Sequence, residues 1–468
     1  MTGFPGNRAN PNKIAISENT VSPDEDVGID DLSIYVPALF LSAAGEFSDL
    51  RGIDSAKVTR GIGIERMAIP DAHEDAATMA AMSLLELMQR NDLPPNKIGK
   101  IYIGTESGVD EAKAIGTYVI GMMEKIFGKG AFQDCCTVEF KSACIATTLA
   151  LESMSFWTAA EEDDLVGVVI ASDIAKYPLH SPGEYTQGAG SVSLLIKRRP
   201  RLISLEGNYG FFTRDENDFF RPIGECNAVV NGKHSNQCYL DAMQGAFDVF
   251  AKRSRKKGLI LPETGECITD YVSHLIFHIP YPRMVEYAAS AIFRHEWRGL
   301  PRWNAVEAEI GEEPKAKAYA IQDDFLAAEA DFIKRFARSS PFQKAFKAKV
   351  KDTTMISRQV GNIYTGSIYL GLASLIEKQR LRPGERVCFG AYGSGCSALV
   401  FSGLVQREAS LIPLRDIEKK LNDRMQISLD EYEKLHEGKM EQSLLQPSQE
   451  FALVGIDRQG YRHYDYIE

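Results

Sequence analysis

Cys144 is the candidate nucleophile of this chain. It stands in Phe-Lys-Ser-Ala-Cys-Ile-Ala-Thr-Thr, where a loop enters a long apolar helical pattern. Free amides and the positive end of a helix dipole lower the pKa of a thiol at such a position, so the segment predicts a thiolate suited to acyl transfer. The alternative is a buried helix cysteine that acts as a small hydrophobic side chain.

Glu106 and His278 are the candidate acid–base groups. Glu106 follows an apolar run in Gly-Thr-Glu-Ser-Gly, and His278 ends another in Leu-Ile-Phe-His-Ile-Pro-Tyr. Ligand crevices of α/β folds open where strands end, so both side chains are expected near a pocket. Taken singly, a strand-end glutamate is usually a solvated charge, and a histidine among apolar residues usually belongs to the core. Their occurrence with a candidate nucleophile favours acid–base chemistry beside Cys144.

Small-residue loops supply weaker candidates. Asn362 lies in Gly-Asn-Ile-Tyr-Thr-Gly-Ser and Ser394 in Gly-Ala-Tyr-Gly-Ser-Gly, where backbone amides can approach a ligand closely. Tight turns explain the same glycines equally well. Gly61 and Gly63 lack the third glycine and the downstream acid of a dinucleotide site. The basic run at 252–257 is typical of a helix C-terminus, with attraction of an anionic ligand as the alternative.

The pattern of apolar residues predicts the strands and helices that must position these groups. Short continuous apolar runs, typical of strands buried on both faces, alternate with helical stretches such as Ala76–Arg90 and Ala143–Ala160. This alternation predicts a layered α/β fold in which helices cover a mixed sheet. The expected strands are Lys100–Thr105, Leu165–Ser172, Ser191–Lys197, Val272–His278, Arg386–Ala391 and Ser397–Val405.

Three segments stand outside this pattern. Residues 1–26 are rich in Asn, Pro, Ser and Gly, which predicts a flexible N-terminal tail. Residues 301–351 are charged and helix-prone, which indicates a helical elaboration rather than part of the core. Residues 451–467 predict a hairpin that turns near Gly460.

Composition limits the class of protein. The 468 residues are 44% hydrophobic and 25% charged, as in ordinary globular proteins. A net charge of -11 argues against a nucleic-acid surface, which needs a basic stripe. No apolar run reaches the roughly 20 residues of a membrane span and no secretory signal is visible, so a cytoplasmic protein without membrane contact is expected. Eight dispersed cysteines predict reduced thiols rather than disulfides or a metal motif.

Several ordered motifs together resemble one known family. Gly-Thr-Glu-Ser-Gly-Val-Asp, Ala-Cys-Ile-Ala-Thr, Phe-His-Ile-Pro-Tyr, Val-Gly-Asn-Ile-Tyr-Thr-Gly-Ser and Tyr-Gly-Ser-Gly occur in the order seen in hydroxymethylglutaryl-CoA synthases. The match extends over residues 27–435 and includes Ala171–Tyr177, Gly183–Gly190 and Asp218–Pro222. The stretches around Cys144 and Thr186 look most similar to archaeal and bacterial members.

The resemblance implies a thiolase-like α/β fold, with two similar α/β halves arranged in five layers (αβαβα). It divides the chain into an N-terminal half at 27–200 and a C-terminal half at 201–468, which includes the elaboration at 301–351. The first half holds Glu106 and Cys144, and the second holds His278, Asn362 and Ser394.

Roles are carried over motif by motif. Cys144 is expected to accept an acetyl group, Glu106 to act as acid and base, and His278 to contact the acetoacetyl carbonyl. Arg283 stands where the family often has a lysine, which keeps the cation but changes its geometry. The resemblance places Tyr177, Thr186, Ser235, Asn362 and Ser394 around the substrate, Asp54, Ser55, Lys57 and Arg283 near coenzyme A, and Asp173 and Asp218 behind the reacting groups.

The implied reaction joins acetyl-CoA, acetoacetyl-CoA and water into 3-hydroxy-3-methylglutaryl-CoA and free CoA, in the mevalonate route to isoprenoids. Partial burial of Glu106 is expected to raise its pKa toward neutrality, as removal of a weakly acidic methyl proton requires. No metal or redox cofactor is needed. The resemblance also implies a homodimer or a dimer of dimers, and a complex with acetoacetyl-CoA thiolase and a small zinc-containing partner.

Three alternatives remain open. Cys144, His278 and Asn362 also fit the Cys-His-Asn set of a ketoacyl synthase or thiolase, although Glu106 argues against decarboxylative condensation. A carrier-protein-dependent synthase of polyketide β-branching would use the same chemistry on a different acceptor. An inactive scaffold within a thiolase assembly is disfavoured by the intact Glu, Cys and His.

Overall fold

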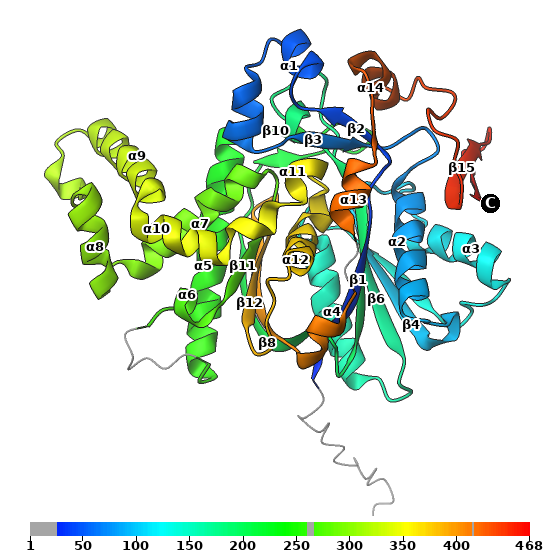
Figure 1. The fold of residues 1–468 in the computed structure, drawn as a ribbon, viewed down its shortest axis with the longest axis horizontal. Coiled ribbons are helices and arrows are strands. Elements are labelled where there is room, and N and C mark those ends of the chain that lie inside the picture. Colours follow the sequence, from blue (N-terminus) through cyan, green and yellow to red (C-terminus); the bar gives the residue numbers. More distant parts are fainter. Residues whose placement is uncertain (1–25, 260–265, 414–415) are drawn as a thin grey trace, which may run out of the picture.

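The computed structural model describes residues 26–259, 266–413 and 416–468, so nearly all of the predicted tail at 1–26 lies outside the described residues. Its centre is a nine-stranded mixed sheet in the order β11-β12-β13-β8-β1-β7-β6-β4-β5. All six strands expected from apolar runs are present in this sheet, within a few residues of their predicted ends. The prediction of helices packed on a mixed sheet is confirmed (Figure 1).

The N-terminal side of the sheet ends at an edge strand. Its strands are β1 (Val27–Tyr35), β7 (Ala189–Arg198), β6 (Val166–Ile174), β4 (Ile98–Gly104) and β5 (Cys136–Phe140). The strand β7 runs antiparallel to β1 and to β6, whereas β6, β4 and β5 are parallel. The carboxyl ends of β4, β5 and β6 therefore open at one edge, which is where an α/β fold places its ligands.

The C-terminal side of the sheet shows the same succession of antiparallel and parallel strand pairs. Its strands are β8 (Ile203–Thr213), β13 (Ser397–Val405), β12 (Arg386–Gly393) and β11 (His274–Phe277). As in the first side, two antiparallel pairings are followed by a parallel one. The two sides meet where β1 pairs with β8 over two residues. Gly28 makes this junction possible, because a Cβ atom there would lie 2.0 Å from the Ile203 carbonyl oxygen.

Helices complete the five layers of the fold (Figure 1). The outer helices α2 (Ala76–Arg90) and α3 (Ile115–Phe127) cover the outside of the N-terminal side, and α5 (Gly232–Lys256) and α7 (Pro282–Trp297) cover the outside of the C-terminal side. Between the two sides of the sheet lie α4 (Ala146–Ala160) and α12 (Ser367–Glu377), joined by a hydrogen bond between the Thr148 and Tyr369 hydroxyls. Residues 367–376 of α12 are all buried, as expected of a helix enclosed on every side.

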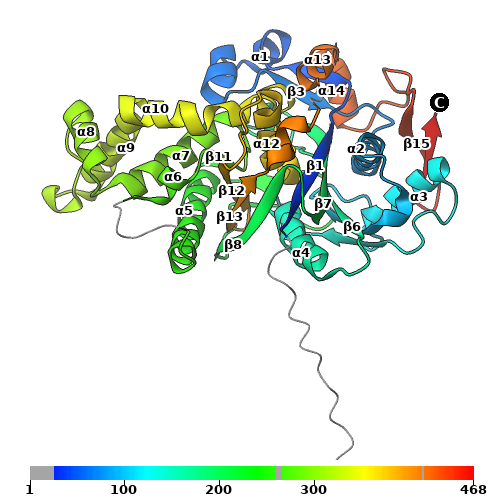
Figure 2. The same ribbon diagram turned by 60° about the horizontal axis from the view of Figure 1, so that its bottom comes forward.

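The segment at 301–351 forms helices α8 (Pro301–Ile310), α9 (Gln322–Arg338) and α10 (Ser340–Lys349). Figures 1 and 2 show these helices projecting beyond α7, away from the centre of the sheet. Aromatic rings attach them to α7: Phe293 and Trp297 pack against Phe336 and Phe342 with ring centroids 6.0 and 6.1 Å apart. The helices thus extend the outer layer and leave the sheet unchanged.

Shorter elements cover the end of the sheet where β4 and β6 finish. The predicted hairpin is confirmed as β15 (Glu450–Ile456) and β16 (Arg462–Ile467), which packs beside α2 and α3.

Within the described part of the chain, no helix is both long and apolar enough to cross a bilayer. The remaining short elements are β2 (Leu39–Ser42), α1 (Glu46–Arg51), the π-helix η1 (Lys57–Ile62), β3 (Arg66–Ile69), β9 (Phe219–Phe220), β10 (Val229–Val230), α6 (Ile268–Tyr271), α11 (Ser357–Val360), α13 (Ile417–Asn422), β14 (Met425–Gln426) and α14 (Leu429–His436).

Candidate active site

Cys144 lies in the turn between β5 and α4, two residues before the helix begins. Only 6% of the residue is exposed. The preceding residue, Ala143, has φ +47°, a left-handed conformation that a non-glycine residue adopts only when its surroundings impose it. The Cys144 thiol donates a hydrogen bond of 2.7 Å to Oε1 of Glu106. Two residues that lie 38 positions apart in the sequence are therefore in direct contact.

The Glu106 carboxyl belongs to the loop that follows β4. Burial, and secondarily the nearby Asp173, raise the pKa of Glu106 to about 8, while the Cys144 thiol and Arg221 oppose the rise. Arg221 also donates a hydrogen bond to the Glu106 backbone carbonyl. A carboxyl group with this pKa can release and recover a proton near neutral pH, in agreement with the elevated pKa predicted from the sequence.

Asp173 fixes the position of the loop that carries Glu106. One of its carboxylate oxygens accepts hydrogen bonds from the Glu106 backbone N–H at 2.7 Å and from the Ser107 hydroxyl at 3.0 Å. The other oxygen accepts from the Thr365 backbone N–H at 3.1 Å and from the Thr365 hydroxyl at 2.6 Å. Because Thr365 precedes α12, this single buried carboxylate connects the two sides of the molecule at the site.

Replacement of Asp173 by alanine is expected to destabilise the protein. The substitution leaves several buried donors without an acceptor, so we expect the free energy of unfolding to fall by about 3 kcal/mol. Urea unfolding followed by circular dichroism measures this loss. Asp163→Ala, which truncates an exposed aspartate, is the control. Equal stability of the two variants would contradict the role given to Asp173.

The sequence-based prediction of a lowered thiol pKa is wrong. Burial raises the pKa of Cys144 well above its ordinary value, and the adjacent Glu106 raises it further. The helix-dipole argument failed because Cys144 precedes α4 rather than occupying its first turn, and because a carboxyl group faces the thiol. The thiol is consequently protonated in the resting protein, and it needs a base to become a nucleophile.

His278 comes from the other side of the molecule, immediately after β11. Burial lowers the pKa of this imidazole to about 3, so the ring is neutral at physiological pH. Its backbone is held on both sides, since its N–H donates to the Gly390 carbonyl and its own carbonyl accepts from the Tyr239 hydroxyl. Among the described residues, nothing hydrogen-bonds to the buried Nδ1 of His278.

One cavity of about 200 Å³ brings these groups together with the other predicted substrate residues. Cys144 and His278 both line it, and Glu106 reaches it through its hydrogen bond to Cys144. The structure therefore gathers residues that the sequence separates by nearly 300 positions. The predicted substrate residues that line the same cavity are Tyr177, Thr186, Ser235, Asn362 and Ser394.

Aromatic side chains of this cavity other than Tyr177 were not predicted from the sequence. Phe219, Tyr281 and Tyr364 line it, and the rings of Tyr177, Phe219 and Tyr364 lie 6.0 to 6.3 Å apart. Tyr364 has φ +41° and follows Asn362 by two residues, so the Asn-Ile-Tyr stretch was the one available signal. These rings exclude water from the neighbourhood of the thiol.

Asp218, the second predicted supporting carboxylate, organises the opposite wall. It accepts hydrogen bonds from Ser235 at 3.0 Å, from the Tyr392 hydroxyl at 2.7 Å and from the Gly395 backbone N–H at 2.8 Å. The residue is fully buried. Ser235, Tyr392 and the turn after β12 are thereby held at fixed positions beside the cavity.

The residues predicted near coenzyme A lie outside this cavity, on the surface around η1. Asp54 and Lys57 are exposed, and Ser55 is half-buried. Arg283, at the start of α7, donates hydrogen bonds to the carbonyls of Arg60 and Gly61. Both neighbours of this arginine in the first turn, Pro282 and Met284, are buried, and Met284 lines the cavity. The four residues therefore form a rim beside the cavity rather than part of it.

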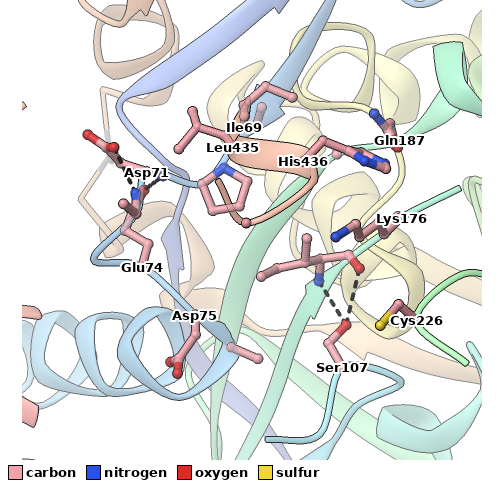
Figure 3. A pocket seen from close by; sticks show the side chains of 18 of the residues that line it. Ile69, Asp71, Glu74, Asp75, Ser107, Lys176, Gln187, Cys226, Leu435 and His436 are labelled. Atoms are coloured by element: carbon pink, nitrogen blue, oxygen red, sulfur yellow. Dashed lines mark hydrogen bonds between the residues drawn. The ribbon is translucent and has the colours of Figure 1, made fainter. Parts of the chain in front are cut away.

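A larger cavity of about 430 Å³ lies on the other side of the Glu106 loop (Figure 3). It includes Ser107, whose hydroxyl hydrogen-bonds to the backbone of Ile174, together with Lys176 and His436. Neither Cys144 nor His278 lines it. Size alone would favour this cavity, but the nucleophile and the imidazole place the chemistry in the smaller one.

The activity should depend on pH through Glu106. Since the pKa of Glu106 is raised to about 8, its carboxylate form is scarce at pH 6 and grows about tenfold per pH unit toward 8. The rate of condensation is therefore expected to rise over this range and to level off above it. Initial rates between pH 6 and 9 test this expectation. As a control, Glu74→Gln removes another buried carboxyl group of raised pKa and should leave the pH profile unchanged. A wild-type rate that stays constant from pH 6 to 8 would contradict the role of Glu106.

The five-layer fold, with a buried thiol, carboxyl and imidazole at the meeting of its two sides, defines the chain as a thiolase-like acyltransferase. Two family models match the chain, the N-terminal part of hydroxymethylglutaryl-coenzyme A synthase at residues 23–200 and its C-terminal part at 203–452. The chain therefore belongs to the hydroxymethylglutaryl-CoA synthase family.

Individual relatives agree with this assignment. The hydroxymethylglutaryl-CoA synthase of Haloferax volcanii is 33% identical over 454 residues, which cover 94% of this chain and 99% of the relative. The enzyme of Enterococcus faecalis is 31% identical over 87% of this chain and 90% of its own. Among solved structures, MvaS in complex with 3-hydroxy-3-methylglutaryl coenzyme A has a TM-score of 0.80 at 29% identity, covering 95% of this chain and all of the other.

Proposed function

We propose that this chain condenses acetyl-CoA with acetoacetyl-CoA and water to give 3-hydroxy-3-methylglutaryl-CoA and CoA. The observation that carries the proposal is the 2.7 Å hydrogen bond between the Cys144 thiol and the Glu106 carboxyl, in a cavity that His278 also lines. A nucleophile and a base in contact are needed both to accept an acetyl group and to activate its methyl. Relatives of 33% and 31% identity named for this activity support the same assignment.

In the first step Glu106 receives the thiol proton as the Cys144 sulfur attacks the acetyl carbonyl. The bond from the acetyl carbon to the CoA sulfur breaks, and the departing thiolate takes the proton from Glu106. The raised pKa of Cys144 makes this assistance necessary, and the pKa of Glu106 suits it to both transfers. The product is an acetyl thioester on Cys144 and a Glu106 carboxylate.

In the second step Glu106 removes a proton from the methyl of the acetyl thioester. The carbanion forms a bond to C3 of acetoacetyl-CoA, whose carbonyl oxygen becomes an alkoxide. His278, a neutral imidazole that lines the cavity, hydrogen-bonds to this oxygen and relays a solvent proton to it. Water then hydrolyses the thioester: its oxygen forms a bond to the acyl carbon, and the bond from that carbon to the Cys144 sulfur breaks. The sulfur takes the proton held by Glu106, which restores the thiol and the carboxylate, and the product leaves as a carboxylate whose protons pass to solvent.

The acceptor distinguishes this proposal from a carrier-dependent synthase. The HMG synthase of the curacin biosynthetic pathway has a similar structure but is 23% identical, a level that supports the fold alone. Purified protein should be assayed with free acetoacetyl-CoA and with the same acyl group on a carrier protein. We expect kcat/KM to be at least about tenfold higher for the free thioester. Use of the carrier-bound acceptor alone would overturn the assignment.

We further propose a place in the mevalonate route, a reducing cytoplasmic location and a homodimeric or dimer-of-dimers assembly. Eight free thiols support a reducing compartment. The edge strand β5 supports self-association, because Val138 on it is 39% exposed and its outer backbone edge is open to pairing. A complex with acetoacetyl-CoA thiolase and a small zinc-containing partner rests on family resemblance alone.

A further inference from the structure

Glu216, His234 and Cys238 bring three different metal-ligand types together outside the catalytic cavity. The distance between Nε2 of His234 and Oε2 of Glu216 is 3.0 Å, and that between Nε2 of His234 and Sγ of Cys238 is 3.6 Å. One ligand atom from each residue lies within 4.8 Å of both others. We propose that these residues bind a thiophilic divalent cation of the zinc type.

Local structure explains why the three side chains meet. His234 and Cys238 are four residues apart in the first turns of α5, so they project from one face of the helix. Glu216 belongs to the segment that follows β8 and passes over this face. Arg214 holds the carboxylate from the other side, with 2.7 Å between its Nε and Oε1 of Glu216. The two oxygens are therefore divided between Arg214 and His234, which leaves Oε2 directed at the imidazole and the thiol.

The spacing of the ligand atoms suits tetrahedral coordination. A zinc ion bound by sulfur, nitrogen and oxygen at about 2.0 to 2.3 Å places these atoms about 3.3 to 3.6 Å apart. The two distances of 3.0 and 3.6 Å lie within a few tenths of an ångström of these values, and the third pair of ligand atoms, on Glu216 and Cys238, lies within 4.8 Å. Cys238 is buried, whereas the side chains of His234 and Glu216 are 40% and 25% exposed. An ion can therefore enter from solvent, and a water molecule can complete the tetrahedron.

A second cluster of metal-ligand types, at His73, Glu74 and Glu450, differs in its ligands and in their hydrogen-bond partners. It contains no thiol. Tyr35 donates hydrogen bonds to both glutamates, and Nδ1 of His73 lies 2.8 Å from the Ser443 hydroxyl. These contacts attach the C-terminal hairpin to the loop before α2, so that cluster is explained by packing. The cluster at Glu216 is the one that a soft cation would select.

The proposed ion would act on the wall of the catalytic cavity rather than in the reaction. Ser235 and Asn236 lie between the two helical ligands and line the cavity. Asp218, two residues after Glu216, accepts the hydrogen bond from Ser235. A cation at Glu216, His234 and Cys238 would thus cross-link the segment after β8 to the start of α5, and hold Ser235 in place. This inference does not depend on the proposed function.

Cobalt is the probe for this site, because thiolate bound to Co²⁺ absorbs light where the free ion does not. Full-length protein, reduced and stripped of metal by a chelator, is titrated with Co²⁺ and then with Zn²⁺. We expect a thiolate-to-cobalt absorption band that saturates at one equivalent and disappears as Zn²⁺ displaces the cobalt. Absence of a stoichiometric band would overturn the proposal.

Variants locate the ion. Cys238→Ser should abolish the band, and Glu216→Gln, a substitution of equal size in an exposed segment that leaves the fold intact, should weaken Zn²⁺ binding at least about tenfold. Cys267→Ser, which removes another buried thiol, and Cys144→Ala should both keep the band. A band that survives in Cys238→Ser, or one that is lost only in Cys144→Ala, would place the metal elsewhere and overturn the proposal. Circular dichroism of each variant separates loss of a ligand from loss of the fold.

Discussion

Replacement of Cys144 by alanine is expected to abolish both acetylation of the protein and condensation. Among the described residues that line the catalytic cavity, Cys144 is the only one with a thiol, and this thiol contacts Glu106, so we expect the acyl intermediate to form on its sulfur. Removal of a covalent nucleophile costs roughly 10⁴-fold or more in rate. We therefore expect product formation in the variant to fall to the background of the assay.

Mass spectrometry after brief exposure to acetyl-CoA provides the direct measurement. The wild-type protein should gain about 42 Da, one acetyl group, and peptide mapping should place it on Cys144. Cys226→Ser removes an exposed thiol beside the larger cavity and should still acquire the adduct. Active wild-type enzyme without the adduct, or an adduct on another cysteine, would remove Cys144 from its proposed role.

Replacement of Glu106 by glutamine should separate the two halves of the reaction. The variant keeps the size of the side chain but cannot accept a proton. Transfer of acetyl to Cys144 should become slower yet still occur, because hydroxide or water can deprotonate the thiol over a longer time. Condensation should fall by about 10³-fold to 10⁴-fold, since Glu106 is the carboxyl group in contact with the sulfur that carries the acetyl group.

Two assays on the same protein sample measure this separation. Mass spectrometry follows acetylation, and release of 3-hydroxy-3-methylglutaryl-CoA follows condensation. Glu152→Gln, a half-buried glutamate of α4 that lies outside the cavity, is a matched control and should retain both activities. If Glu106→Gln condensed at the wild-type rate, the base would have to be another residue.

The strands and the three proposed catalytic residues could be recognised in the sequence because each has a local signal. The run at 397–405 became β13 without a change of boundary, and the helix at 76–90 became α2 in the same way. Both are continuous patterns that a buried strand or a half-buried helix imposes on the residues themselves. Glu106 and His278 were found because a polar residue at the end of an apolar run is conspicuous.

The electrostatics of the site could not be predicted from local patterns. The pKa of Cys144 depends on a carboxyl group 38 residues away in the sequence, so a rule based on its own helix gave the wrong direction. The hydrogen bonds from Thr365 to Asp173 likewise exist only once α12 lies between the two sides of the sheet. Such contacts follow from tertiary packing, which one sequence does not display.

The aromatic lining escaped prediction for a related reason. Phe219, Tyr281 and Tyr364 come from three separate loops and have no common spacing. The helix α5 was predicted only at its end, where the basic run at 252–257 indicated a helix C-terminus. Its earlier turns were missed, since their polar start obscured the apolar positions Met243, Phe247 and Phe250 that pack against the sheet.

The division of the catalytic groups between two sides that meet at β1 and β8 bears on how the protein matures. Cys144 and Glu106 belong to one side, and His278 belongs to the other. A nascent polypeptide that has completed only its first portion already contains the reactive sulfur, yet it lacks the imidazole and the wall that exclude solvent. The complete set of three groups therefore exists only after the later portion of the chain has docked against the first.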